Sequence, residues 1–356
     1  MRGGRMRNAE CGVRNGEWRI PDWRAGAVPR ALLAGWLGLA ALAPARAQDE
    51  PLWQGDPISE ELESVYVKGL AYLVKTQESG GTWGARDSGQ QAGVVGMAVL
   101  AMLAHGDDPN TGPYSEAIRK GIDFLVKSAN AQNGYIGPSM YNHGFATLAL
   151  AEAYGNVNDP RIGPALEKAV KLILTSQAAN SYGAWRYSPE SRDADTTVSG
   201  AQVVALLAAR NAGIAVPEKA IEKALQFYRQ TQGGDGGFGY TSADGTSPPR
   251  AAIGTLVFAL AKRKNSQEFK AGFRHLQQID FTEAGHVYYY LYYAAQAYFH
   301  GDMESWRKWK ETNRKNLAAS QGSDGSWTGS EGTIFCTSAA LLSLALEYRY
   351  LPIYER

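Results

Sequence analysis

A glutamine followed by a glycine-rich bend recurs six times along the chain, and this repeat constrains the fold more than any other feature. Each copy lies between two apolar helical runs, as in KTQESGGTWG, where Gln77 precedes Trp83. The steps between successive glutamines are 55, 45, 55, 46 and 43 residues, a period typical of repeat architectures. The six glutamines are Gln77, Gln132, Gln177, Gln232, Gln278 and Gln321, and the aromatic residues that follow five of them are Trp83, Tyr135, Trp185, Phe238 and Trp327.

Every repeat predicts a pair of helices with different surroundings. The first helix, such as YSEAIRKGIDFLVKSA at 114–129, is apolar on one face and charged on the other, so one face meets water. The second, such as AGVVGMAVLAMLAHG at 92–106, is apolar nearly all round and is therefore expected to be buried. Six outer amphipathic helices paired with six inner apolar ones predict an all-α fold of two concentric rings, an (α/α)6 toroid.

The bends themselves are predicted to be joints between neighbouring repeats. A glutamine side chain can satisfy backbone groups that are left unpaired at a helix end. An aromatic ring offers a large packing area. The fifth copy, HLQQIDFTEAG, keeps a glutamine but has no aromatic residue in the bend.

The first 47 residues are predicted to be an N-terminal extension with a secretory signal. The apolar run ALLAGWLGLAALA at 31–43 is short for a membrane span, and ARA at 45–47 supplies the small residues of a cleavage site. We therefore expect an exported protein, periplasmic or secreted, with one toroid domain over 48–356. An uncleaved anchor is the alternative; after cleavage no transmembrane span is expected, and peripheral membrane contact stays open.

Charge and cysteine content narrow the function classes further. Removal of residues 1–47 takes eight arginines and three acids from the 36 basic and 35 acidic residues, which leaves a net charge of −4. Such a chain has no basic field for nucleic acid. Cys336 is then the one remaining cysteine, so an internal disulfide is excluded and packing must stabilise the fold.

The repeated segments resemble the QW repeats of squalene–hopene cyclases and the related repeats of protein prenyltransferase β subunits. The likeness covers roughly residues 56–350, and the chain is similar to exported bacterial proteins with prenyltransferase/squalene oxidase repeats. This resemblance implies the toroid fold but is weak for the reaction, because a fold does not fix a function. Hopanoid cyclases use two helical barrels, whereas this chain has room for one.

The segment RDADTTVSGAQ resembles the cyclase motif D-x-D-D-T-A, whose middle aspartate protonates the substrate. The resemblance implies that Asp193 is the first acid and Asp195 the proton donor, with Thr196 in place of the third acid. Protonation of an alkene needs a strong acid in a dry site, with neighbouring groups that tune its pKa. The loss of one carboxylate from the motif therefore weakens the case for Asp195 as a proton donor. The alternative is a helix N-cap, where aspartate and threonine are preferred.

A second candidate is the segment YNHGFATLALAEAYG at 141–155, in which His143-Gly144 opens an inner helix. It resembles the His-Gly-Gly segment of prenyltransferase β subunits, with Phe145 in place of the second glycine. Because inner-helix starts surround one mouth of a toroid, we expect His143 to face the central cavity together with Tyr141 and Thr196. A local hydrogen-bonding role for His143 is the alternative.

The tyrosine-rich segment GHVYYYLYYAAQAYF at 285–299 supplies further cavity candidates. Six tyrosines on one helix point in every direction, so some are expected in the cavity and others in the core. The cavity candidates are His286, Tyr288, Tyr289 and Tyr292. A prenyltransferase-type zinc site is not expected, because Ile334 replaces the acid two residues before Cys336; no metal or cofactor is predicted.

The sequence therefore favours a non-catalytic or divergent member of the cyclase-like and prenyltransferase-like toroids. Such a protein would bind an apolar ligand such as an isoprenoid, a peptide or a glycan in its central cavity. A squalene or terpene cyclase-like isomerase with Asp195 as general acid is the main alternative. A glycan-acting toroid enzyme is a third hypothesis. Whether any reaction is catalysed stays open at this point.

Overall fold

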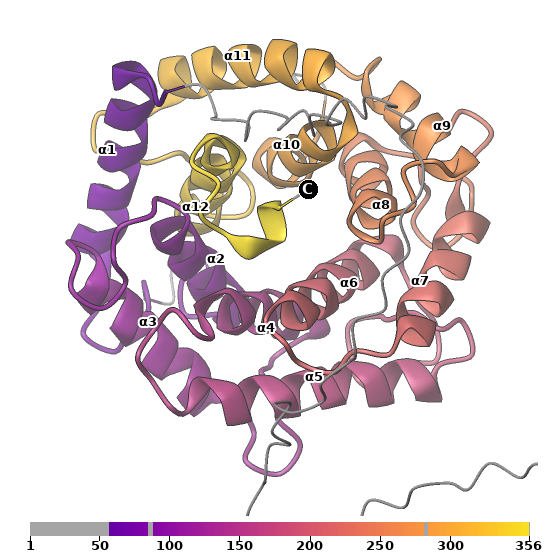
Figure 1. Cartoon of the computed structure of the whole chain (residues 1–356), viewed down its shortest axis with the longest axis horizontal. Helices are drawn as coiled ribbons and strands as arrows, with labels where there is room; N and C mark the ends of the chain where they lie inside the picture. The colour runs from indigo at the N-terminus through magenta and orange to yellow at the C-terminus, as the bar shows by residue number, and fades with distance from the viewer. Residues whose placement is uncertain (1–56, 85–87, 281–283, 356) are drawn as a thin grey trace, which may run out of the picture. The chain divides into compact units, whose positions relative to one another are not determined.

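The computed structural model describes residues 57–84, 88–280 and 284–355, and these residues form twelve α-helices with no strand among them. The helices alternate between an outer and an inner ring (Figure 1), which confirms the predicted α/α toroid. The outer helices are α1(Glu60–Thr76), α3(Ser115–Ser128), α5(Ile162–Ala179), α7(Glu218–Thr231), α9(Gln267–Leu276) and α11(Met303–Ser320). The inner helices are α2(Ala92–Leu103), α4(Met140–Ala153), α6(Thr196–Asn211), α8(Pro248–Leu260), α10(Val287–Gly301) and α12(Thr333–Leu344).

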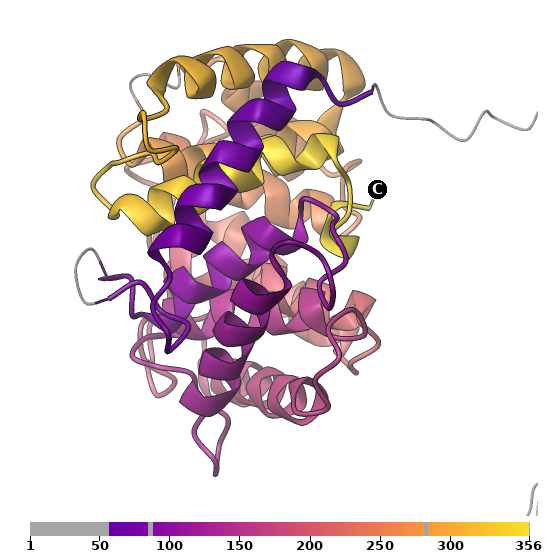
Figure 2. The same cartoon turned by 90° about the vertical axis from the view of Figure 1, so that its left-hand side faces the viewer.

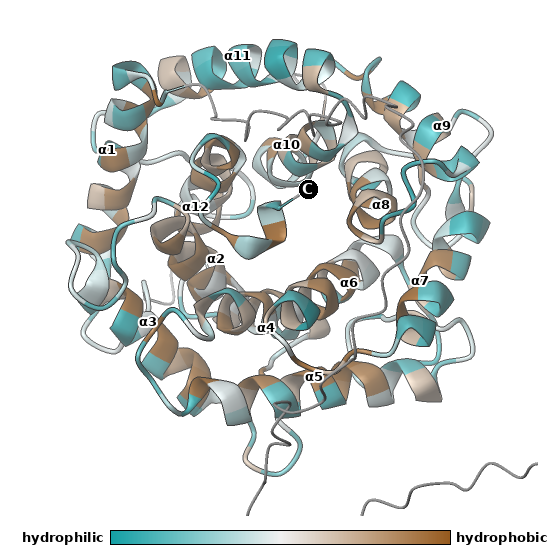
Figure 3. Cartoon of the chain, viewed as in Figure 1, coloured by the Kyte–Doolittle hydropathy of each residue, from teal (hydrophilic) through white to brown (hydrophobic). Residues whose placement is uncertain are grey.

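Hydropathy separates the two rings as the sequence pattern predicts. The inner helices are mostly apolar, whereas the outer helices carry hydrophilic residues (Figure 3). All twelve residues of α2 are buried, but only five of the fourteen residues of α3 are. No described helix is long and apolar enough to cross a membrane. The predicted signal at residues 1–47 lies outside the described residues.

A glutamine joint closes the ring between its last and first hairpins. The Gln321 side chain, directly after α11, donates from Nε2 to the carbonyl oxygen of Val65 in α1 at 2.9 Å and to that of Gly325 at 2.9 Å. Figure 2 shows α1 lying across this side of the ring. Residues that are about 250 positions apart in sequence are therefore held together by one amide group, as a closed toroid requires.

Three further glutamines make the same pair of bonds. In each case Nε2 donates to a glycine carbonyl of its own bend and to a carbonyl in the next outer helix, so it ties neighbouring repeats together. The pairs are Gln77 with Gly81 and Ala117, Gln177 with Gly183 and Ala220, and Gln232 with Gly236 and Glu268. The indoles of Trp83, Trp185 and Trp327 donate to carbonyls of the preceding outer helix, and Phe238 is fully buried.

Two of the predicted glutamines do not make this joint. Gln132 is exposed, because α3 already ends at Ser128 and Ala129 takes the position directly after the helix. In this repeat the link to the next outer helix comes from His143, whose Nε2 lies 3.1 Å from the carbonyl oxygen of Ala169. His143 Nδ1 accepts a hydrogen bond from the amide of Ile136. Ile136 is fully buried, whereas Tyr135, the aromatic residue predicted for this bend, is half-buried.

The fifth repeat departs from the prediction by one residue. Helix α9 ends at Leu276, so Gln277 and not Gln278 caps its C-terminus. Gln277 Nε2 donates to the hydroxyl of Ser305 in α11 at 2.7 Å, and both glutamines are exposed. The sequence pattern did not distinguish Gln277 from Gln278, because the two glutamines are adjacent. The position of the last hydrogen-bonded turn of the helix decides which of them lies at the joint.

The chain itself closes one end of the ring, where the inner helices terminate. The 3₁₀ turn η4(Pro352–Tyr354) enters there, and Ile353 and Tyr354 are buried. The amide of Ile353 donates to Glu152 Oε2 at 3.4 Å near the end of α4. Burial raises the pKa of Glu152 to about 8, so this carboxyl is largely protonated at neutral pH.

Candidate functional site

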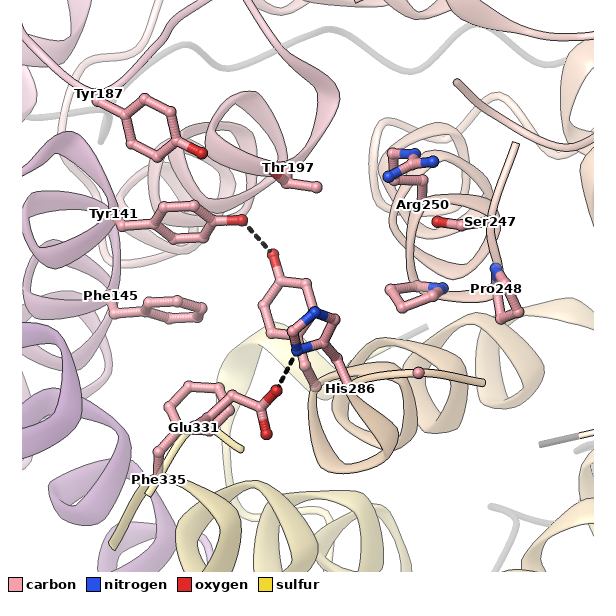
Figure 4. Close-up of a pocket in the computed structure, with 13 residues that line it drawn as sticks. Tyr141, Phe145, Tyr187, Thr197, Ser247, Pro248, Arg250, His286, Glu331 and Phe335 are labelled. Carbon is pink, nitrogen blue, oxygen red and sulfur yellow. Dashed lines mark hydrogen bonds and ion pairs between the residues drawn. The ribbon is translucent and has the colours of Figure 1, made fainter. Parts of the chain in front are cut away.

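A cavity of about 530 Å³ lies at the opposite mouth, where the inner helices begin. Its volume is within the range of roughly 300–1,000 Å³ that is usual for small-ligand sites. Five inner helices contribute residues from their first two turns or from the loops before them (Figure 4). The lining residues are Tyr141, Phe145, Tyr187, Thr197, Ser247, Pro248, Pro249, Arg250, Gly285, His286, Tyr289, Glu331 and Phe335.

Aromatic side chains form the floor and one wall of this cavity. Tyr141 and Phe145, one helical turn apart on α4, stack with ring centroids 6.2 Å apart. The Tyr141 and Tyr289 hydroxyls lie 2.8 Å apart and bond α4 to α10 across the mouth. Tyr289 also packs on Phe335 of α12, with centroids 6.2 Å apart. These contacts fix the rings, so the wall is preorganised before any ligand arrives.

The lumen beneath the floor is filled by the chain's own side chains. Tyr292 and Tyr293 of α10 are buried, and their rings pack edge to face at 4.7 Å. Phe145 meets Tyr292 at 6.1 Å. Burial raises the pKa of both tyrosines, so their hydroxyls stay neutral. The cavity is therefore a pocket at the mouth and does not continue as an apolar tunnel.

An imidazole and a carboxylate meet on another side of the cavity. His286 Nδ1 and Glu331 Oε1 form a hydrogen-bonded pair, and the Ser330 hydroxyl donates to the same oxygen at 2.7 Å. Burial alone would raise the pKa of Glu331, but the bonds from Ser330 and His286 hold it below its ordinary value. His286 has a left-handed backbone, with φ 58° and ψ 53°. Such strain in a residue other than glycine concentrates at functional sites.

The wall opposite the aromatic rings carries Arg250, in the first turn of α8 (Figure 4). Its Nε donates to the carbonyl of Phe238 at 3.4 Å and its Nη2 to that of Gly245. The side chain is half-buried, and this burial lowers the pKa of Arg250. Ser247, the residue before α8, turns its hydroxyl to the cavity instead of capping the helix.

The structure places the proposed proton donor, Asp195, beside the cavity and not in its lining. Asp195 is the N-cap of α6: Oδ1 accepts from the amides of Thr197 and Val198 at 2.9 and 2.8 Å and from the Thr197 hydroxyl at 2.6 Å. Its Oδ2 is buried without a hydrogen-bond partner, 4.0 Å from Arg186 Nε. Burial raises the pKa of Asp195, although these hydrogen bonds oppose the shift.

The other candidates from the two sequence motifs also serve the scaffold. Asp193 is exposed and pairs with Arg186 at 3.1 Å. The Thr196 hydroxyl donates to the carbonyl of Gly239 at 2.8 Å, so it bonds to the next bend. Contrary to the prediction, His143 does not face the cavity, because both of its ring nitrogens bond to backbone groups in the joint between α3 and α5.

The tyrosine-rich helix divides its candidates between three environments. Tyr289 and His286 line the cavity together with Tyr141, where they were expected. Tyr288 instead lies between α10 and α11 beside Leu317, and Tyr292 lies in the core. Successive residues of an α-helix differ by about 100° in direction, so one mouth can receive only part of such a run.

Sequence reasoning missed Arg250, Glu331 and Phe335. These residues lie within or just before the first turns of α8 and α12, in the segments SPPR and SEGTIF. The expectation that inner-helix starts surround one mouth applied to these segments too. Among the described residues, no three histidine, cysteine, aspartate or glutamate side chains are placed to hold a metal ion.

One family model matches most of the chain. Residues 63–325 match the model of a family described as Domain of unknown function (DUF6288). No curated protein matches the sequence. The matching family model is not one of squalene cyclases, so the narrower likeness to their repeats stays a prediction.

Two solved structures with the same fold are enzymes of different classes. A variant of the type II terpene cyclase MstE from Scytonema, in complex with merosterolic acid A, has a TM-score of 0.56 at 16% identity over 82% of this chain and 98% of that chain. The GH76A alpha-1,6-mannanase from Salegentibacter sp. HEL1_6 has a TM-score of 0.59 at 11% identity, over 80% and 98%. At such identities the likeness shows the fold alone.

Proposed function

The chain belongs to the DUF6288 family, and we propose that it binds a glycan in the cavity at the toroid mouth without reacting with it. The observation that carries this proposal is the pairing of an aromatic wall with polar side chains above a filled lumen. The export that we expect from residues 31–43 forms part of the proposal, because glycans are abundant outside the cytoplasm.

A sugar suits this lining better than an extended apolar molecule does. A sugar ring presents a face of C–H groups and an edge of hydroxyls, which match aromatic faces and hydrogen-bonding groups respectively. The rings of Tyr141 and Tyr289 and the polar groups of Arg250 and Glu331 supply both kinds of partner. An isoprenoid chain needs apolar depth, but Tyr292 and Tyr293 occupy the lumen below.

The arrangement of carboxylates supports binding without hydrolysis. Glycoside hydrolysis commonly needs two carboxylates that flank the scissile bond. Of the residues that line the cavity in the described part of the chain, Glu331 alone carries a carboxylate. Asp195 is fully buried and accepts a hydrogen bond from the Thr197 hydroxyl, and Asp193 is exposed in an ion pair with Arg186.

A pair of tyrosines offers a matched test of glycan binding. Tyr187 lines the cavity and is 47% exposed, whereas Tyr182 is 52% exposed but lies outside it. With the mature protein and a glycan selected on an array, we expect Tyr187→Ala to weaken binding about tenfold, since aromatic contacts of this kind dominate binding energies. Titration calorimetry measures the change.

Tyr182→Ala is the control and should bind like the unchanged protein. Equal losses in both variants would indicate a general structural effect, and an unchanged affinity in Tyr187→Ala would place the glycan elsewhere. Absence of binding across the array would contradict the proposed function.

A cyclase-like isomerase is the second candidate, and one observation favours it. Asp195 combines a buried Oδ2 that has no hydrogen-bond partner with a raised pKa, as a proton donor would. We expect no cyclised product when the protein is incubated with linear C15 to C30 isoprenoids and the extract is analysed by mass spectrometry. Product from the unchanged protein that disappears in Asp195→Asn would overturn this expectation. Asparagine is also a good N-cap, so this variant should fold.

A further inference from the structure

We propose that the glycan bound at the mouth is acidic, and that Arg250 pairs with the carboxylate of a uronic acid residue. This inference rests on the proposed function and names the class of sugar. It starts from the ionic partners of the arginines. Arg186, Arg229 and Arg263 lie 3.1, 3.0 and 3.0 Å from carboxylate oxygens. Arg250 has no carboxylate within the 4.0 Å of an ion pair in the part of the chain that the structure describes.

The surroundings of Arg250 strengthen its attraction for an anion. The residue is partly removed from water, and two backbone carbonyls hold the guanidinium against the cavity wall. A partly desolvated charge in a fixed position interacts more strongly with an opposite charge than a mobile surface charge does. The cavity supplies the space for that opposite charge, because Arg250 itself lines it.

The donors at this wall suit a carboxylate better than a phosphate. Helix N-termini usually bind phosphate through several free backbone amides. Here Pro248 and Pro249 occupy the first two positions of α8 and carry no N–H. The side-chain donors at this wall are the Ser247 hydroxyl and the Arg250 guanidinium. Nε and one Nη2 hydrogen of Arg250 already bond to backbone carbonyls, so the Nη1–Nη2 end is the fork that can match the two oxygens of a carboxylate.

Another wall of the cavity limits the ligand to one negative group. The pKa of Glu331 is held below its ordinary value, so its carboxylate is ionised and repels a second anion. The same carboxylate can accept hydrogen bonds from neutral hydroxyls. A ligand with one carboxylate toward Arg250, hydroxyls toward Glu331 and a C–H face toward Tyr141 and Tyr289 is a uronic acid residue in a glycan.

Pairs of acidic trisaccharides and their methyl esters provide the test. Trimers of galacturonic, glucuronic and mannuronic acid are titrated into the mature protein, each beside its methyl ester, which keeps the sugar and removes the charge. We expect at least one acid to bind about tenfold more tightly than its ester, as for a charged hydrogen-bonded pair. Raising the salt concentration should weaken binding of the acid and leave the ester unaffected.

Variants of Arg250 assign that difference to one side chain. Arg250→Gln should bring the acid to the affinity of its ester while ester binding persists, which also shows that the variant is folded. Arg250→Lys should recover part of the preference, because it keeps the charge and loses the fork. Arg119→Gln, at an exposed arginine outside this cavity, is the control and should behave like the unchanged protein.

Each other outcome contradicts a defined statement. Equal binding of acid and ester, unchanged in Arg250→Gln, would overturn the acidic ligand and leave glycan binding intact. Binding of neutral trisaccharides alone would do the same. If no acidic, esterified or neutral glycan binds, the proposed function fails and this inference fails with it.

Discussion

Replacing Gly325 with alanine is expected to destabilise the protein by about 3 kcal/mol, because two costs coincide at this position. Gly325 has φ +92°, a left-handed conformation that costs a residue with a Cβ about 1–2 kcal/mol. A Cβ here would also lie 2.3 Å from the backbone oxygen of Lys68 in α1. Backbone of a packed helix cannot withdraw cheaply, so the joint that closes the ring would have to separate.

Two other glycines divide this cost into its parts. Gly213 has φ +89° but nothing within 4 Å of an added Cβ, so Gly213→Ala should cost about 1 kcal/mol through strain alone. Gly234 has neither a positive φ nor a neighbour within 4 Å, so Gly234→Ala should be nearly neutral. Urea unfolding followed by circular dichroism ranks the three variants. If Gly325→Ala matched Gly213→Ala, the contact between the bend and α1 would not hold the ring closed.

The contribution of Glu152 to the stability of the fold is expected to fall as the pH rises from about 4.5 to about 8. In the unfolded chain this glutamate loses its proton near its ordinary pKa of 4.5, whereas burial keeps it protonated in the folded protein until about pH 8. Between these values the unfolded state binds fewer protons at this group, so its contribution to the free energy of unfolding decreases by up to about 1.4 kcal/mol per pH unit. The contribution is complete below pH 4.5 and is lost through pH 8.

The neighbours of Glu152 explain the sign of this shift. Burial is the largest cause and raises the pKa; the amide of Ile353 opposes it, and the charge of Glu355 adds to it. Tyr292 and Tyr354 also face this carboxyl and stay neutral in the same pH range. Carboxyls with lowered pKa values, such as Asp159, titrate below this range. His143 acts in the opposite direction below pH 6.5, because burial lowers its pKa to about 4. The effect of Glu152 is therefore the difference between the unchanged protein and a variant that lacks this carboxyl.

Glu152→Gln removes the titration and keeps an acceptor for Ile353. The stability difference between Glu152→Gln and the unchanged protein should grow with pH across this range, and the variant should be more stable by several kcal/mol at pH 8. Parallel urea titrations at pH 5, 6.5 and 8 measure both curves. Parallel slopes for the two proteins would show that water reaches Glu152, and that the C-terminal segment does not seal this end of the ring.

Hydrophobic periodicity was enough to predict the two rings. The helix at 92–103 is apolar all round and the helix at 115–128 is apolar on one face, and these patterns assign the first to the inside and the second to the outside. The spacing of Gln77, Gln177, Gln232 and Gln321 likewise indicated the joints, since each side chain does bond to the next outer helix.

The same pattern could not fix which residue lies at an irregular joint. His143 replaces a glutamine in the second repeat, and Gln277 takes the position predicted for Gln278 in the fifth. These outcomes depend on the residues at which α3 and α9 end. Packing determines these ends, and the sequence pattern predicts them only to within one or two residues.

By itself the sequence determined the fold class, because burial of an apolar helical face is a property of local periodicity. Only the tertiary structure decided the site. Tyr141, Arg250, Tyr289 and Glu331 belong to four segments, and they meet only because the closed ring brings the starts of their helices to one mouth. The direction of each side chain within a first turn then determines whether it faces the cavity, as Thr197 does, or caps the helix beside it, as Asp195 does. That choice depends on how each inner helix is rotated against its neighbours, which is information that no single segment contains.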